Sequence, residues 1–174
     1  MQRDDFFEWP DRAAYGGTWL VMPLFMSSHY PGIERHFAEN QLRAPETTRL
    51  LRAIPGVTAA VFSWQEPYCH IYAHRDAKAI EVLRAHLALE VPDGARMRIE
   101  RDIVTWQEGT CLLFDGFLDH ETGNDSPHRR VLLMVDACLN GAEFERLQSW
   151  RHANGLVPEP KLVLQHAFTR RTLA

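Results

Sequence analysis

Short runs of apolar and β-branched residues, separated by turn residues, dominate the middle of this chain. Runs of this length and spacing are typical of strands in an all-β sandwich or barrel. They lie at Thr58–Trp64, His70–Ala73, Leu83–Val91, Met97–Ile99, Ile103–Trp106, Thr110–Phe114 and Val131–Ala137. Turns are expected at Pro92-Asp93-Gly94, Glu108-Gly109 and Gly123-Asn124-Asp125. We therefore expect a mainly β fold, a double-stranded β-helix of the cupin-like jelly-roll type.

A few helices should flank these strands. Pro45 suits the first turn of a short helix with an apolar side, which Pro55-Gly56 ends. A last amphipathic helix is expected over about Ala142–Ala153 and would close the domain. We find no repeat or linker and expect a single domain over 1–174, with its core at about 18–139 and a C-terminal helix and tail at 142–174. The role of the tail after Gly155 stays open.

The run Leu83–Val91 alternates apolar and polar positions. Its odd positions are all apolar, whereas its even positions include Arg84 and His86. Because successive side chains of a strand point to opposite faces, Arg84 and His86 share a face opposite the hydrophobic core. In a jelly roll that second face is either exposed to solvent or lines a pocket, and the pattern leaves both open.

Composition excludes several classes of protein. The 174 residues are 45% hydrophobic and 24% charged, as in an ordinary globular protein, and the net charge of −4 argues against a nucleic-acid partner. The odd number of scattered cysteines indicates reduced core thiols rather than disulfides. The N-terminus lacks the apolar stretch of a signal peptide. We expect a soluble, cytoplasmic protein without a stable membrane anchor; its oligomeric state stays open.

The segment His74-Arg75-Asp76 follows a predicted strand and is a candidate metal-binding motif. With a distant histidine, this spacing can form the two-histidine, one-carboxylate triad of non-haem iron oxygenases, which leaves three positions of Fe(II) free for a cosubstrate and O₂. His120 is the preferred third ligand. Arg130, ten residues further on, suits an anionic cosubstrate because its guanidinium pairs bidentately with a carboxylate.

Simpler interpretations exist for each of these residues. A His-x-Asp arises often by chance, and Arg130 beside Arg129 could be a solvated strand start. Asp119 and Glu121 could orient His120, but we expect them to be ordinary surface charges. The ordered set of His-x-Asp, His and Arg at strand edges of an all-β chain favours the metal site.

These residues sit within a longer series of motifs from about Thr18 to Leu139, which resembles the aspartyl/asparaginyl β-hydroxylase family. The series comprises Phe62-Ser63-Trp64, His74-Arg75-Asp76, Leu83-Arg84-Ala85-His86-Leu87-Ala88-Leu89, Trp106-Gln107-Glu108-Gly109, Phe114-Asp115-Gly116, Asp119-His120-Glu121 and Arg130 through Asp136. These motifs occur in the family's order and close to its spacing.

The resemblance implies a double-stranded β-helix that uses Fe(II), with 2-oxoglutarate and O₂ as cosubstrates. It assigns His74 and His120 to iron. It also implies that Ser63 and Arg130 bind the distal carboxylate of 2-oxoglutarate, and that His86 binds the carboxylate nearer the metal. Arg84 would serve the substrate or cosubstrate side of the same pocket. The expected reaction is hydroxylation of an unactivated carbon.

Two departures from the family pattern bear on the substrate. The animal members that modify protein domains have glycine where this chain has Asp76, whereas a complete triad is available here, as in bacterial relatives. The strand before Ser63 is also apolar, where the protein-modifying members carry polar substrate contacts.

The function therefore has several candidates. The resemblance favours an amino acid, or an amino-acid residue in a peptide or natural product, as substrate. A lipid acyl chain is an alternative. A cupin-like metal- or ligand-binding module without oxygenase activity, or a non-catalytic relative acting as an interaction protein, also stays open.

Overall fold

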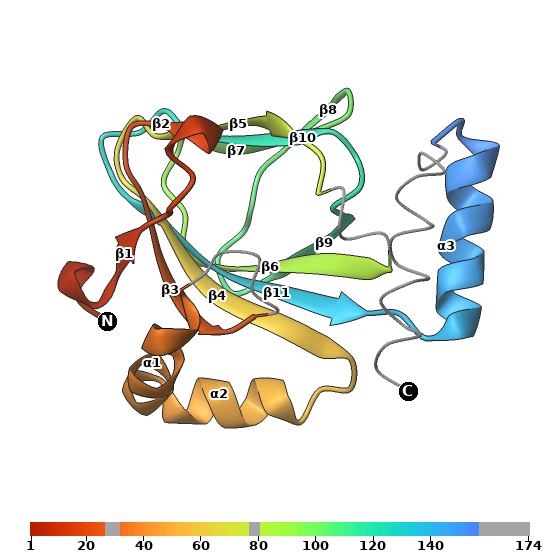
Figure 1. Cartoon of the computed structure of the whole chain (residues 1–174). Coiled ribbons are helices and arrows are strands. Elements are labelled where there is room, and N and C mark those ends of the chain that lie inside the picture. The colour runs from red at the N-terminus through yellow and green to blue at the C-terminus, as the bar shows by residue number, and fades with distance from the viewer. Residues whose placement is uncertain (27–31, 77–80, 157–174) are drawn as a thin grey trace.

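Two antiparallel sheets form the body of the protein, with helices at their outer face and at one end (Figure 1). The computed structural model describes residues 1–26, 32–76 and 81–156. The strands are β1 Phe7–Glu8, β2 Tyr15–Gly16, β3 Trp19–Phe25, β4 Val57–Gln65, β5 His70–His74, β6 Val82–Glu90, β7 Ala95–Ile99, β8 Asp102–Val104, β9 Cys111–Asp115, β10 His120–Asn124 and β11 Arg130–Cys138. The helices are α1 Phe37–Arg43, α2 Pro45–Arg52 and α3 Gly141–Ala153, with short 3₁₀ turns at Arg3–Asp5, Arg12–Ala14 and Glu34–His36.

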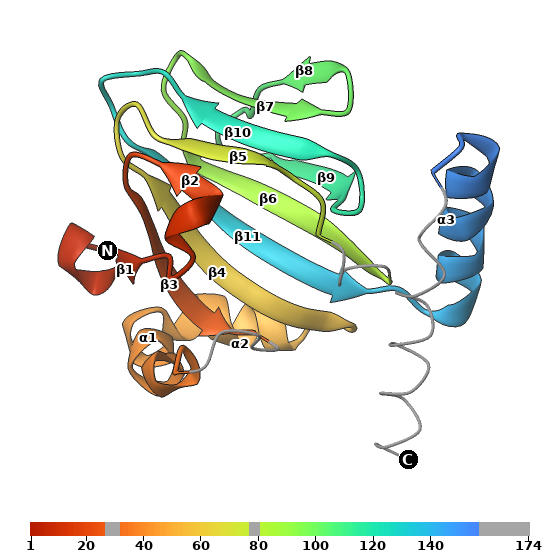
Figure 2. The same cartoon turned by 45° about the horizontal axis from the view of Figure 1, so that its top comes forward.

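The strand order identifies the fold. The larger sheet runs β1-β3-β4-β11-β6-β9, and the smaller sheet runs β2-β5-β10-β7-β8. From β4 onward the chain passes back and forth between the two sheets, so that β4, β6, β9 and β11 face β5, β7, β8 and β10 (Figure 2). This winding is the double-stranded β-helix, which confirms the expected jelly-roll fold.

All of the strands predicted from the pattern are present, with ends that differ by at most two residues. Four strands, β1, β2, β3 and β10, were not predicted. The turn expected at Gly123-Asn124-Asp125 is wrong because Gly123 and Asn124 belong to β10. The residues of β10 have poor strand propensity. They form a strand because β10 lies between β5 and β7, and because Asn124 donates to the backbone carbonyl oxygens of Glu66 and His128 at 3.1 and 2.8 Å.

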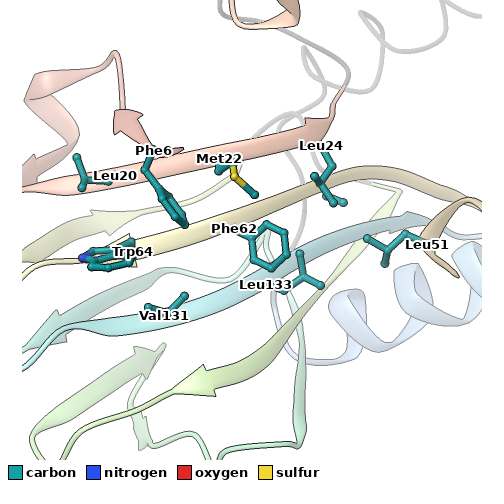
Figure 3. Close-up of a cluster of buried hydrophobic side chains, with 10 residues drawn as sticks. Phe6, Leu20, Met22, Leu24, Leu51, Phe62, Trp64, Val131 and Leu133 are labelled. Atoms are coloured by element: carbon teal, nitrogen blue, oxygen red, sulfur yellow. The ribbon is translucent and has the colours of Figure 1, made fainter. Parts of the chain in front are cut away.

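The largest apolar cluster covers the outer face of the larger sheet (Figure 3). It joins alternate side chains of β3, β4 and β11 with Phe6 before β1 and Leu51 of α2. Its buried members are Phe6, Leu20, Met22, Leu24, Leu51, Ala60, Phe62, Trp64, Val131 and Leu133. Because these residues occupy one face of each strand, the intervening residues must point between the two sheets.

Strand β6 follows the predicted alternation. Leu87 and Leu89 pack against the outer cluster, whereas His86 is buried on the opposite face, between the sheets. The face shared by Arg84 and His86 therefore lines the interior of the jelly roll.

Helix α3 forms where it was predicted, but its expected amphipathic character is wrong. Among the described residues of α3, Arg151 alone is buried. The helix lies beyond the start of β6 and the end of β11 (Figure 2). The tail residues 157–174 lie outside the described residues.

The cysteines are free, as expected, but the prediction that all are core thiols is wrong. Cys69 is buried, whereas Cys111 and Cys138 are exposed at the first residue of β9 and the last residue of β11. Burial raises the pKa of the Cys69 thiol to about 11. In the described part of the chain, no helix has the length and apolar character needed to span a membrane.

The outer cluster predicts that two leucines of the larger sheet, one on β11 and one on β9, differ in their effect on stability. Leu133→Ala should lower the free energy of unfolding by about 2–5 kcal/mol, because it empties a buried site. Leu113→Ala should change it by less than about 0.5 kcal/mol, because Leu113 is 61% exposed. Urea denaturation followed by circular dichroism measures both values. Equal destabilisation by the two variants would contradict this description of the core.

Candidate active site

Two histidines face each other across neighbouring strands of the smaller sheet. His120 at the start of β10 and His74 at the end of β5 are direct cross-strand partners, with ring centroids 4.3 Å apart. Next to this pair, β5 holds one extra residue relative to β10, which forms a bulge. Tyr72 and Ala73 are both exposed, whereas Ile71 is buried. In an unbroken strand Ile71 and His74 would point to opposite faces, so the bulge turns His74 toward the interior.

Hydrogen bonds orient both imidazoles in the same way. Nδ1 of His74 lies 2.7 Å from the carbonyl oxygen of Tyr72, and Nδ1 of His120 lies 2.8 Å from that of Leu118. A carbonyl oxygen can only accept, so each Nδ1 carries a proton, and Nε2 is the nitrogen that a neutral ring would offer to a metal. Burial lowers the pKa of His120, which favours the neutral form that binds metals.

Asp76 completes a group of three potential ligands. Its carboxylate oxygens lie 3.9 Å from Nε2 of His74 and 3.9 Å from Nε2 of His120. One ligand atom from each residue lies within 4.8 Å of the others. The backbone N–H of Asp76 donates to the carbonyl oxygen of Gly116 at 2.9 Å, which holds this residue against the turn between β9 and β10.

Arg84 lies between two carboxylates. It donates to Asp76 through Nη1, and its Nε and Nη2 donate to the two carboxylate oxygens of Asp136 at 2.7 and 2.9 Å. Burial would lower the pKa of Arg84, but Asp76 and Asp136 together raise it above its ordinary value. The structure thus places Arg84 beside the candidate metal ligand, with its charge offset by two acids.

Arg130 has the opposite environment. The residue is 1% exposed, its Nε has no hydrogen-bond partner, and no carboxylate pairs with it among the described residues. Its Nη2 donates to Oγ of Ser63 at 3.1 Å, and Nε1 of Trp19 donates to the same oxygen at 2.9 Å. The Ser63 hydroxyl proton is therefore left to donate to a third group. Burial lowers the pKa of Arg130 to about 9, so it is still a cation at neutral pH.

Aromatic rings connect the buried Arg130 to His86 and to His120. The Arg130 guanidinium lies 5.0 Å from the centroid of Trp106, whose ring lies 6.0 Å from His86. Phe114 stands edge-on to His86 at 4.9 Å and to His120 at 5.2 Å. Neither ring nitrogen of His86 has a hydrogen-bond partner in the described part of the chain. Burial, together with the charges of Arg84 and Arg130, lowers the pKa of His86, so its ring is neutral.

The residues fit a divalent metal and an anionic ligand. Two neutral imidazoles and a carboxylate form the donor set of non-haem Fe(II) sites. A buried arginine without a carboxylate is costly unless an anion occupies its site. The unpartnered donors Arg130 Nε, Trp106 Nε1 and a nitrogen of His86 are those that such an anion would need.

The structure brings together every candidate chosen from the sequence. The interpretation of Asp119 and Glu121 as surface charges also agrees with it, because both acids pair with Arg98 at 2.7 and 3.1 Å and the His120 ring is held by a backbone carbonyl instead.

Sequence reasoning missed the roles of Trp19 and of Trp106, the first residue of the Trp106–Gly109 motif. Within this motif Glu108 accepts the N–H of Val91 at 2.8 Å, and Gly109 has a φ of +79°, a conformation that favours glycine. The motif thus fixes the loop that presents Trp106 to Arg130. Trp19 carried no comparable signal.

Comparisons with known proteins agree with the family resemblance seen in the sequence. A family model described as aspartyl/asparaginyl beta-hydroxylase matches residues 1–138. An ornithine lipid ester-linked acyl 2-hydroxylase from Rhizobium tropici is 41% identical over 121 residues, which cover 67% of this chain and 43% of that protein. The aspartyl/asparaginyl beta-hydroxylase of Homo sapiens is 32% identical over 99 residues, which cover 53% of this chain and 13% of that protein. The chain spans less than half the length of these curated relatives.

Similar solved structures include two proteins from Thermotoga maritima. One is described as a predicted oxalate decarboxylase, with 11% identity and a TM-score of 0.49 over 77% of this chain and 92% of that one. The other is described as a cupin-like protein, with 8% identity and a TM-score of 0.47 over 81% and 94%.

The bulged strand provides a matched test of the metal site. His74→Ala should weaken Co(II) binding by more than about 100-fold, since loss of even an outer partner of a ligand costs roughly 10–100-fold. His70→Ala should leave the affinity unchanged, because His70 lies on the same strand but its ring pairs with Glu121 at 3.5 Å on the exposed face. Calorimetric titration of the metal-free protein measures both. Equal affinities in the two variants would exclude His74 as a ligand.

Proposed function

This chain belongs to the aspartyl/asparaginyl beta-hydroxylase family, and we propose that it is an Fe(II)- and 2-oxoglutarate-dependent dioxygenase that hydroxylates an unactivated carbon. The observation that carries the proposal is that a group of two histidines and one carboxylate lies in the same jelly-roll interior as a buried arginine that has no described carboxylate partner. The family membership supports a hydroxylase; the metal, the cosubstrate and the substrate are our proposal.

Each group has a task in this scheme. His74, Asp76 and His120 would hold Fe(II), which when bound supplies the activation of O₂ coupled to decarboxylation of 2-oxoglutarate. Arg130 and Ser63 would bind the distal carboxylate of 2-oxoglutarate, which would fix its orientation.

Second contacts would complete the binding of the cosubstrate. A neutral His86 would donate one N–H to the carboxylate nearer the metal. The aromatic wall of Trp106 and Phe114 would exclude water from the cosubstrate. The overall reaction balances as 2-oxoglutarate, O₂ and a C–H bond giving succinate, CO₂ and an alcohol.

The environment of Arg84 bears on the substrate. An amino acid presents a carboxylate, for which Arg84 would be the natural partner on the substrate side. Here two acids already offset the Arg84 charge, and the neighbouring interior positions Ala59, Val61 and Met134 are apolar. We therefore propose a neutral acyl chain as the substrate, in line with the relative described as an acyl 2-hydroxylase.

An amino acid, or an amino-acid residue in a peptide or natural product, is the second candidate, supported by the similarity to the human aspartyl/asparaginyl beta-hydroxylase. A binding module without catalysis is the third. We also propose a cytoplasmic location, consistent with the free cysteines.

The cosubstrate assignment predicts the effect of two adjacent arginines. Arg130→Ala should weaken 2-oxoglutarate binding by about 2–5 kcal/mol, or roughly thirty-fold to several thousand-fold, because it removes a buried charge partner. Arg129→Ala should have no measurable effect, because Arg129 is paired with Glu90 at the surface at 2.6 Å. The visible charge-transfer absorption of the anaerobic Fe(II) complex, titrated with 2-oxoglutarate, reports the affinity. Absence of this absorption in wild-type protein that has bound iron would leave the binding module as the function.

The substrate assignment has its own test. Wild-type protein supplied with Fe(II), 2-oxoglutarate and O₂ should convert an acyl ester to a product heavier by one oxygen atom and release succinate in equal amount. N-acetyl-aspartate and an aspartyl peptide should support no more succinate than protein without substrate. Turnover of either aspartyl compound but not of the acyl ester would replace our choice with the second candidate.

A further inference from the structure

Helix α3 lies beyond the residues that the family model matches. One of its residues, Arg151, is nevertheless buried against the body of the domain. Arg151 is fully buried, and its Nε and Nη2 donate to the two carboxylate oxygens of Asp115 at 2.8 and 2.7 Å. Its guanidinium also lies 4.8 Å from the ring centroid of Phe117. Asp115 is the last residue of β9, so this ion pair joins the helix to the turn that leads into β10.

That turn contacts two of the three candidate metal ligands. Asp115 also accepts the N–H of Phe117 at 3.0 Å, which shapes the turn. The carbonyl oxygen of Gly116 accepts the N–H of Asp76, and the carbonyl oxygen of Leu118 holds Nδ1 of His120.

Gly116 also packs directly on Asp76. A Cβ placed on Gly116 would lie 3.0 Å from Oδ2 of Asp76 and 3.5 Å from its Cβ. The position of this turn therefore sets where the carboxylate of Asp76 and the ring of His120 point.

We propose that Arg151 is a positioning residue for the metal centre, acting through Asp115 and the turn at residues 115–118. The inference rests on the metal site proposed above. A buried ion pair often contributes less to stability than apolar residues of the same volume, so its presence at this turn suits a geometric role. The bidentate contact fixes both the distance and the orientation of the Asp115 carboxylate.

The test compares Co(II) binding in four variants of the full chain. Arg151→Met removes the charge but keeps the length of the side chain, and it leaves Asp115 buried without its partner. The double variant Arg151→Met/Asp115→Asn removes both charges, so its fold should survive. Arg151→Lys keeps a charge that cannot pair bidentately. Arg146→Met, which changes an exposed arginine on the same helix, is the matched control.

We expect the double variant to melt within a few degrees of wild type but to bind Co(II) about 10- to 100-fold more weakly, with altered intensity of the cobalt ligand-field bands. Arg151→Lys should restore part of the affinity, and Arg146→Met should match wild type. Wild-type affinity and spectrum in a folded double variant would overturn the proposal. That result is expected if the ion pair only stabilises the fold and does not position the metal ligands. Failure of wild-type protein to bind Co(II) would instead refute the metal site itself.

Discussion

The alternation of side chains on β4, β6 and β11 is the constraint on which the rest of this structure depends. One face of these strands packs into the outer apolar cluster, so the other face must line the interior. A shift of one residue in the pairing would turn Arg130 and Ser63 outward and place Val131 and Trp64 inside. The apolar residues of the outer face thus determine which polar residues reach the site.

The interior that results is electrostatically divided. At one end Arg84 is balanced by Asp76 and Asp136, whereas at the other end Arg130 has no described acid beside it. A fold tolerates such an unpaired charge when a ligand supplies the missing anion, since the free energy lost on burying the cation is regained on binding. The contrast between the balanced Arg84 and the unpaired Arg130 is a stronger sign of a binding site than the histidines alone. The proposed cosubstrate, 2-oxoglutarate, would bind the metal at one end and would need a cation for its carboxylate at the other.

The parts of this arrangement that follow strand periodicity were predictable, and the parts that depend on contacts were not. Alternation over Leu83–Val91 predicted the shared face of Arg84 and His86 correctly. The bulge that turns His74 inward has no sequence signal, because a bulge is a mismatch between two strands rather than a property of one. Strand β10 escaped prediction because its polar residues find their partners in segments that are distant in the sequence, such as Gln65, Glu66 and Arg98. Arg151 escaped because an arginine on a mostly exposed helix normally faces water.

The two sheets contribute unlike halves of the site, and this has a mechanical consequence. The three candidate metal ligands come from the smaller sheet and the segment after β5, whereas Ser63, His86 and Arg130 come from the larger sheet. Among the described residues, Phe114 against His120 and Arg84 against Asp76 are contacts that join the halves. The distance between the candidate metal ligands and Arg130 therefore depends on how firmly the sheets are held together at this end. The turn after β9 connects the larger sheet to the smaller one. The ion pair between Arg151 of α3 and Asp115 holds this turn, so it is well placed to influence that distance.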